Sequence, residues 1–396
     1  MGLTCLNRKS GGYRMRNEKI LIIGAGLGGL ALANGLVQAG FNVTVFERDE
    51  SPISRTQGYR ISIRSLGICA LNALLLPEKM SRLSLAKVKD VGDGFTLANE
   101  NMEPIFSIPI GQDAAHQFLR SGLRNLLSEG INIQWGKSLI KFEDNGNQVI
   151  AYFEDGSSVV GDLLVGCDGG GSIVRELLPS IYRDKLGSVP KVVDSNRIVL
   201  GGHIDRTPEW EKLLPLNKKG IVRFQGEYSH CIGVCFSERA DRSPTVFWAF
   251  SQEREDFENP LQILDRCKQL MRNESWHENL KKLIYDTPVE AIMVPWLIRT
   301  TKFPDSDQFP LVPTGRVTLL GDAAHAMPSD RALGGNNALE DARLLSTLLA
   351  DSREPIEWPK LIEKYEKEMF VRAKIAVRES ENAAIYFQNI RNSTVN

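Results

Sequence analysis

The segment EKILIIGAGLGGLALANGLVQAGFNVTVFERDE, residues 18–50, constrains the fold more than any other part of the chain. It has the pattern of a strand, a glycine turn, a helix and a second strand. The run ILII is continuously apolar, as expected of a parallel strand buried on both faces. In the pattern GxGxxG, Gly24 permits a tight turn, Gly26 lets the backbone approach a pyrophosphate, and Gly29 lets helix and strand pack closely. The segment therefore predicts a nucleotide-binding βαβ unit.

The second strand of this unit ends at an acidic residue. Glu47 lies 23 residues after Gly24, close to the roughly 20 expected of an acid that binds a ribose hydroxyl pair. A carboxylate there disfavours a 2′-phosphate, so the pattern favours NAD or FAD. The neighbouring Arg48 is a further cofactor-binding candidate. Residues 20–46 carry no charge, which by itself would also fit a membrane span, but six glycines between Gly24 and Gly40 argue against that alternative.

The strand pattern changes along the rest of the chain. Residues 65–76 and 116–130 have the pattern of helices, and the second carries leucines on one face. Longer runs typical of antiparallel strands follow from about residue 185 to 300. The predicted boundaries are a flexible tail at 1–17, a discontinuous nucleotide-binding domain at 18–184 and 300–350, an inserted domain at 185–299 with contributions from 80–112, and C-terminal helices at 351–396.

A second strand that ends at a carboxylate follows the inserted domain. The apolar run RVTLL leads into Gly321-Asp322, and a helix is expected from about Asn336. Asn337 and Glu340 fit a capping box at its start. Open α/β sheets bind ligands at the carboxyl ends of their strands. FAD is long enough to need one unit for its adenosine and a remote unit for its ribityl-flavin end, whereas a two-domain NAD dehydrogenase would not need the second unit.

Charge and cysteine content bear on the compartment and the partners. The net charge of −1 over 396 residues gives no global field that would attract nucleic acid or a membrane surface. The six cysteines show neither CxxC nor zinc spacing, so we expect no metal site and reduced thiols in a cytoplasmic protein. The expected partners are small molecules, with no nucleic acid and no transmembrane segment, in a monomer or homodimer.

Three motifs in order give the chain a family resemblance. They are GxGxxG at 24–29, the Asp-Gly motif in GDLLVGCDGGGSIVREL at 161–177, and the Gly-Asp motif in GDAAHAM at 321–327. With them the chain resembles the class A flavoprotein monooxygenases, the p-hydroxybenzoate-hydroxylase-like family, and especially its fungal secondary-metabolism members, over nearly all of 18–350. The resemblance implies an α/β fold with an FAD-binding Rossmann-like domain of the glutathione-reductase type, an inserted antiparallel-sheet substrate domain and C-terminal helices. It also implies FAD as cofactor, with NADPH or NADH as a transient co-substrate and O2.

The resemblance carries over to particular residues. Glu47 would bind the adenosine ribose, Arg120 would lie near the ribityl chain and phosphates, and Asp322 would accept hydrogen bonds from ribityl hydroxyls. A helix N-terminus at the flavin would favour its anionic reduced form. The other positions expected near the cofactor are Asp168 in the Asp-Gly motif, Gly335 and Asn336 at the pyrimidine end of the flavin, and Gly58 and Arg60 in QGYRI.

The loop after His325 departs from the family pattern. Family members commonly have proline four residues after this histidine, where the chain has Ser329. Small residues are usual six and seven positions after it, where the chain has Arg331 and Ala332. The resemblance places this loop against the isoalloxazine, so the departures bear on oxygen chemistry and not on FAD binding. Arg331 is either a ligand for an anionic or phenolate substrate or a solvated loop arginine.

The favoured function is an FAD-dependent NAD(P)H monooxygenase that hydroxylates or epoxidises a small aromatic or alkenyl metabolite in secondary metabolism. His230 and Arg223, on expected substrate-domain strands, are further substrate candidates, and no catalytic base can be chosen. The alternative is an FAD-bound reductase or cyclase of the same fold without oxygen insertion. A halogenase is disfavoured because the WxWxIP signature is absent. A non-enzymatic binding protein is disfavoured by the intact glycines and acids.

Overall fold

The computed structural model describes residues 15–54, 60–89, 91–92, 94–108, 116–182, 189–226, 230–303, 309 and 311–393. Its first sheet is parallel and has five strands, in the order β17 (Val317–Leu319), β11 (Leu163–Gly166), β1 (Lys19–Ile23), β2 (Asn42–Phe46) and β7 (Ile133–Gln134). Helix α1 (Leu27–Gln38) connects β1 to β2, as the sequence predicts. Strand β1 lies in the middle of the sheet, which explains its continuous apolar run.

Helices and two small sheets surround this parallel sheet. The helices are α2 (Ser65–Leu74), α3 (Pro77–Ser81), α4 (Arg120–Ser128), α5 (Ile173–Tyr182), α9 (Asp322–His325), α10 (Gly334–Ala350) and α11 (Trp358–Ser393), with short 3-10 helices η1 (Arg82–Ala86) and η5 (Ser329–Arg331). The small sheets are β10 (Ser158–Gly161), β9 (Val149–Phe153) and β8 (Leu139–Asp144), and the pair β3 (Arg60–Ile63) and β6 (His116–Leu119).

The predicted helix over 116–130 is wrong in its first four residues. Residues 116–119 form β6, which pairs antiparallel with β3, and the helix begins only at Arg120. The leucine pattern that predicted the helix includes Leu119. Its side chain is buried in the strand, as it would be in a helix, so the apolar pattern does not distinguish the two. Pairing with a strand more than fifty residues earlier decides the conformation, and local periodicity does not detect such pairing.

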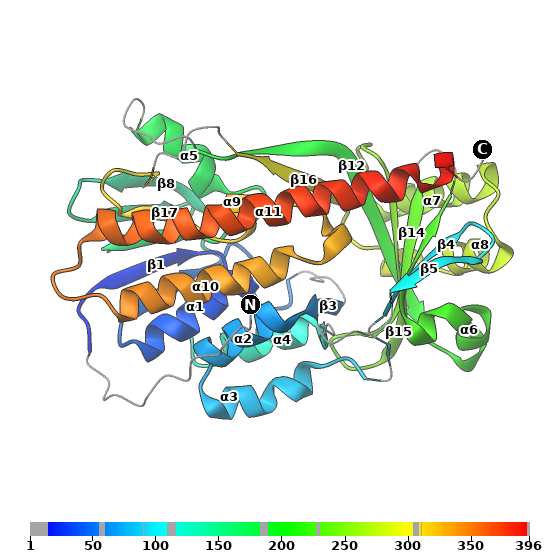
Figure 1. The fold of residues 1–396 in the computed structure, drawn as a ribbon, viewed down its shortest axis with the longest axis horizontal. Coiled ribbons are helices and arrows are strands. Elements are labelled where there is room, and N and C mark those ends of the chain that lie inside the picture. The colour runs from blue at the N-terminus through cyan, green and yellow to red at the C-terminus, as the bar shows by residue number, and fades with distance from the viewer. Residues whose placement is uncertain are drawn as a thin grey trace.

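The second large sheet has seven strands. Their order is β16 (Trp296–Lys302), β12 (Lys191–Asp205), β15 (Pro244–Glu253), β14 (Cys231–Glu238), β13 (Gly220–Gln225), β4 (Gly94–Asn99) and β5 (Pro104–Ile108). Helices α6 (Pro208–Leu213), α7 (Pro260–Asn273) and α8 (Glu278–Tyr285), with η3 (Pro215–Lys219) and η4 (Val289–Ala291), complete this part of the molecule. Figure 1 shows α6, α7 and α8 on the side of this sheet away from the parallel sheet.

The two faces of the seven-stranded sheet pack differently. On β15, Trp248 and Phe250 belong to the hydrophobic cluster that also contains residues of α7 and α8. Phe247, which precedes Trp248, belongs to a small cluster with Cys235 and Met293. Alternate residues of a strand point to opposite faces, so Phe247 and Cys235 mark the face opposite to α7 and α8. We call this the inner face, because it is turned toward the parallel sheet (Figure 1).

Helix α11 runs along both sheets (Figure 1). Near its start, Tyr365 donates a hydrogen bond to the Leu319 carbonyl of β17, at 3.0 Å. Near its end, Phe387 packs with Leu97 of β4. In between, Thr300 of β16 donates to Glu381, at 2.9 Å. The helix therefore joins the parallel sheet to the seven-stranded sheet.

Residues 15–17, which belong to the predicted flexible tail, are described, and Arg16 is anchored there. Its guanidinium donates to the carbonyl oxygens of Ala350 and Ser352, at 3.0 and 2.9 Å, and lies over the Phe41 ring. These contacts join the residues before β1 to the end of α10. The predicted domain boundaries themselves stay a prediction.

Glu366 of α11 is a buried carboxyl group held between two segments that precede it. One of its oxygens accepts from the Leu311 backbone N–H and the other bonds the Thr318 hydroxyl of β17, each at 2.7 Å. Burial raises the pKa of Glu366 to about 8. The folded protein therefore keeps this carboxyl group largely protonated at neutral pH, whereas the unfolded chain ionises it above about 4.5.

We expect Glu366→Gln to remove a pH-dependent part of the stability. The folded-state pKa lies above the unfolded value, so stability contributed by the protonated group is complete below about pH 4.5 and is lost as the pH rises to about 8. Relative to wild type, the variant should gain roughly 1.4 kcal/mol per pH unit in that window. Urea unfolding between pH 5 and 8 measures this difference. Glu363→Gln, at a partly exposed position of the same helix, is the control, and a flat difference for Glu366→Gln would contradict the assignment.

Candidate functional site

Four predicted site segments meet at one edge of the parallel sheet. Strands β1, β2, β11 and β17 are mutually parallel and are followed by the Gly24 turn, Glu47, Asp168 and Asp322, respectively. The carboxyl ends of parallel strands share one edge of a sheet. The structure thus brings together residues that lie up to 298 positions apart between Gly24 and Asp322.

The glycine turn has the geometry that the GxGxxG pattern predicts. Gly24 has a φ of +108°, and a Cβ there would lie 2.5 Å from the carbonyl oxygen of Cys167. A Cβ at Gly29 would lie 2.2 Å from the Gly24 carbonyl oxygen. A Cβ at Gly26 would meet nothing within 4 Å. Two of the glycines therefore permit close packing, and the third leaves open space at the N-terminus of α1, where a phosphate group can be bound by backbone N–H groups.

Glu47 is buried and fixed beside the glycine turn. Its carboxylate accepts from the Ala25 N–H at 2.9 Å and from the Asp49 N–H at 3.1 Å. The guanidinium of Arg124 on α4 lies 3.7 Å from the same carboxylate and donates to the Ala25 carbonyl oxygen at 2.8 Å. Our sequence reasoning missed Arg124, although an arginine one helical turn after Arg120 was a usable signal. The predicted neighbour Arg48 is exposed.

A buried carboxylate holds the Gly-Asp turn. Asp341 of α10 accepts from the Gly321 N–H at 3.0 Å and bonds His325 at 2.6 Å, and Arg372 of α11 forms an ion pair with it. Burial alone would lower the pKa of His325, but the charge and hydrogen bond of Asp341 and the charge of Asp322 outweigh burial and raise it. His325 is fully buried, and its role in this contact is structural.

Asp322 begins α9 and is exposed to solvent. Loss of surrounding water nevertheless raises its pKa, against the opposing charges of His325 and Arg120. A Cβ on Gly334, the first residue of α10, would be 3.6 Å from Asp322 Oδ1. The predicted residues Arg120 and Asp322 therefore lie within electrostatic range of each other, beside the N-terminus of a 17-residue helix.

The start of α10 differs from the predicted capping box. The helix begins at Gly334, so Asn337 is inside it, and Glu340 forms an ion pair with Arg343 instead of reaching back to Asn337. The predicted capping box is therefore wrong. The start of the helix is fixed by Asn336, whose side chain accepts from the Arg64 N–H at 2.8 Å and donates to the carbonyl oxygens of Ser62 and Ala332, at 3.0 and 2.8 Å.

The neighbouring predicted glycine, Gly335, packs closely against β3. A Cβ at this position would lie 2.8 Å from the side chain of Ile61. The Asn336 side chain and the Gly335 backbone thus join α10 to the small β3–β6 sheet. Backbone N–H groups of the first helical turn remain available to a ligand, because the first turn of a helix has no internal partners for them.

Asp168 caps the helix that follows it. Its carboxylate accepts from the Ser172 hydroxyl at 2.5 Å and from the Val174 N–H at 3.2 Å, just inside the start of α5. Arg175, which our sequence reasoning also missed, donates to the carbonyl oxygens of Gly170 and Ala323, at 2.9 and 2.8 Å. The Asp-Gly motif is therefore fixed to the helix that carries Asp322.

The three substrate candidates have different environments. Arg331 is half exposed and lies 3.7 Å from Glu379 of α11. His230 bonds Glu274 at 2.5 Å and its ring packs near Phe250, a residue of the cluster on the α7 side. Arg223 alone points to the inner face, where it forms an ion pair with Asp330 of η5.

Two further predicted positions lie in the QGYRI segment. The buried Arg60 donates to the carbonyl oxygens of Phe236 and Gly92, at 3.2 and 3.3 Å. It thus bonds the seven-stranded sheet, and within the described residues its Nε and Nη2 atoms have no hydrogen-bond partner. Gly58 lies outside the described residues.

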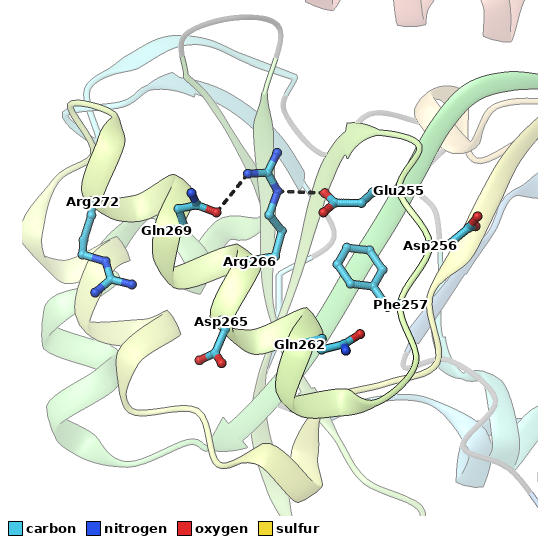
Figure 2. Close-up of a pocket in the computed structure, with 8 residues that line it drawn as sticks. All are labelled: Glu255, Asp256, Phe257, Gln262, Asp265, Arg266, Gln269 and Arg272. Atoms are coloured by element: carbon cyan, nitrogen blue, oxygen red, sulfur yellow. Dashed lines mark hydrogen bonds and ion pairs between the residues drawn. The ribbon is translucent and has the colours of Figure 1, made fainter.

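Beyond these positions, a pocket, a metal-binding group or a membrane span among the described residues would also bear on function. The polar pocket in Figure 2 lies on α7 and the segment after β15, where Arg266 bonds Glu255 and Gln269, and it contains none of the predicted site residues. No described group of histidine, cysteine and acidic side chains is arranged to hold a metal ion. None of the described helices combines the length and apolar character that a bilayer span requires.

Comparisons with known proteins identify the family to which the chain belongs. The model of the FAD binding domain family matches residues 17–380. The FAD-dependent monooxygenase cctM of Talaromyces islandicus is 29% identical, with 94% of this chain and 93% of that protein covered. The 6-hydroxynicotinate 3-monooxygenase of Pseudomonas fluorescens is 30% identical, with coverage of 85% and 83%. The structure of Klebsiella pneumoniae HpxO with FAD and uric acid superposes with a TM-score of 0.75 at 20% identity, over 95% of this chain and 90% of that one. The chain belongs to the FAD binding domain family and is an FAD-dependent monooxygenase.

Proposed function

We propose that the protein uses FAD, NADPH or NADH and O2 to hydroxylate or epoxidise a small aromatic or alkenyl metabolite of secondary metabolism, in the cytoplasm. When bound, FAD transfers electrons from the nicotinamide to oxygen. The observation that carries the proposal is the common edge where Gly26, Glu47 and Asp322 meet. An open phosphate-binding turn lies at one part of this edge, and an accessible carboxylate beside a helix N-terminus lies at another.

The proposed cofactor contacts follow the order of strands along this edge. The turn at Gly24, Gly26 and Gly29 binds the pyrophosphate through backbone N–H groups. Glu47 binds the adenosine ribose, since an ionised carboxylate has lone pairs beyond the two that Ala25 and Asp49 use. The other proposed contacts with FAD are Asp322 and Arg120 at the ribityl chain and the first turn of α10 at Gly335 and Asn336 beside the flavin. Gly58 and Arg60 are proposed to lie near the flavin, and Arg48 and Asp168 are further proposed cofactor-binding residues.

The inner face of the seven-stranded sheet is the proposed substrate side. It carries an apolar cluster of Cys235, Phe247 and Met293 and the charged side chain of Arg223. An apolar surface with one cation suits an aromatic compound that carries one acidic or carbonyl oxygen. The exposed pair of Arg331 with Glu379 and the buried pair of His230 with Glu274 favour structural roles for those two candidates.

We expect Asp322→Ala to weaken FAD binding by roughly 10- to 100-fold, because a charged hydrogen-bond acceptor contributes about 1.5–3 kcal/mol. Asp322→Asn should show a smaller loss, since its amide oxygen still accepts. Titration of the apoprotein with FAD, followed by flavin fluorescence, measures both. Asp351→Asn, an exposed acid at the end of α10, is the matched control. Unchanged FAD affinity in a folded Asp322→Ala protein would show that the ribityl chain is bound elsewhere.

Oxygen insertion is tested with labelled gas. Compounds that stimulate NADPH or NADH oxidation by the purified yellow protein are incubated under 18O2, and the products are analysed by mass spectrometry. A monooxygenase incorporates one 18O atom into each product molecule. A product that lacks the label would instead support a reductase or cyclase. The altered loop at 328–332 would then explain the loss of oxygen insertion. A colourless protein that takes up no FAD would overturn the whole proposal.

A further inference from the structure

One buried ion pair joins the loop after the Gly-Asp turn to the inner face of the seven-stranded sheet. Arg223 of β13 pairs with Asp330 of η5, and their side chains are only 16% and 10% exposed. The Phe387 ring of α11 covers the guanidinium, with its centroid 4.9 Å from the Arg223 Cζ atom. Asp330 and Phe387 thus hold the guanidinium from two different elements.

This ion pair leaves much of the Arg223 guanidinium unused. A guanidinium has five N–H donors in a fixed plane, and the bond to Asp330 uses the Nη1 group. The Nε atom is buried, and within the part of the chain that the structure describes it has no hydrogen-bond partner. A buried, oriented cation with unused donors can receive an oxygen acceptor at low entropic cost.

The surface next to Arg223 is low and open. The register aligns Arg223 with Gly233 of β14 and then with Ala249 of β15, whereas the next aligned residue, Gly201 of β12, is covered by the Trp296 ring. A Cβ at Gly233 would have no neighbour closer than 3.9 Å. Gly233 and Ala249 stay partly exposed although they lie in central strands. The apolar Phe247 borders them on the inner face. A flat, apolar group therefore has room beside the guanidinium.

A second guanidinium group lies near Arg223. Arg197 of β12 bonds Ser251 through its guanidinium, at 3.1–3.2 Å. Burial lowers the pKa of Arg197, and the charges of Arg223 and Asp330 are near enough to act on it as well. The carboxylates of Glu253 and Asp330 act on Arg197 in the opposite direction to Arg223, so the two guanidinium groups are balanced by two carboxylates.

We propose that Arg223 binds an acidic oxygen, a carboxylate or an ionised phenol, of a planar apolar substrate. In this arrangement Asp330 and Phe387 are positioning residues that fix the guanidinium, and Asp330 also weakens the attraction for anions. The assignment deepens the proposed monooxygenase function and rests on it. It gives the altered loop at 328–332 a role in substrate selection, because Asp330 lies in that loop.

The test uses the FAD-loaded protein and two pairs of probes, benzoate with benzamide and 2-naphthoate with 2-naphthamide. Their binding is measured by calorimetry and by perturbation of the flavin absorbance. Arg223→Met should weaken binding of the acids roughly tenfold or more relative to the amides, and Arg223→Lys should restore part of it. Asp330→Asn should strengthen binding of the acids about fivefold and leave the amides unchanged, because it removes a nearby negative charge and keeps an acceptor for Arg223.

A purely structural ion pair gives a different result. Both Arg223→Met and Asp330→Asn would then lower the unfolding temperature and shift acids and amides equally, and the opposite signs for the two variants would not appear. That outcome, or wild-type holoenzyme that binds none of the acids, overturns the assignment. Arg254→Gln, at an exposed arginine at the end of the same sheet, is the control. Loss of FAD from the wild type would instead count against the proposed function, and the FAD content of each sample separates the two failures.

Discussion

The buried carboxylate of Asp341 is the contact on which the cofactor side of the molecule depends. It accepts from the Gly321 N–H and bonds His325 and Arg372, so it joins the Gly-Asp turn, α10 and α11. A buried charge costs several kcal/mol unless it is paired. All three partners must therefore be in place before the turn is fixed. The orientation of Asp322 is a property of the assembled core and not of the local sequence.

At both ends of the candidate site, a carboxylate pairs with an arginine that is distant in the sequence. Glu47 is set against Arg124, which is 77 residues away, and Asp330 is set against Arg223, which is 107 residues away. Each pair joins a loop at a strand end to a helix or a sheet. Groups fixed in this way need little rearrangement when a ligand binds, so more of the interaction free energy appears as affinity.

The sequence predicted those features that local chemistry determines. The glycine turn, α1 and the acid after β2 lie within 33 residues, and their spacing alone indicates a βαβ unit. The sequence also showed that β17, like β2, is followed by a carboxylate. Contacts across the chain were not visible in it. The β6 strand at 116–119 forms because it pairs with β3. The start of α10 is fixed by contacts with Arg64 and Ser62. In the loop, Asp330 and not Arg331 points to the inner face, because Asp330 pairs with Arg223. Periodicity reports which face of an element is apolar, but not which distant polar group is near it.

The C-terminal helix has a consequence for how the molecule forms. Residues 358–393 follow both sheets in the chain, and Tyr365 completes the β17 side of the parallel sheet while Phe387 completes the inner face of the other sheet. Multidomain chains generally fold in order as they leave the ribosome. Here neither sheet can reach its final packing before this helix has formed, because both depend on contacts with it. The two halves of the molecule therefore complete their packing together.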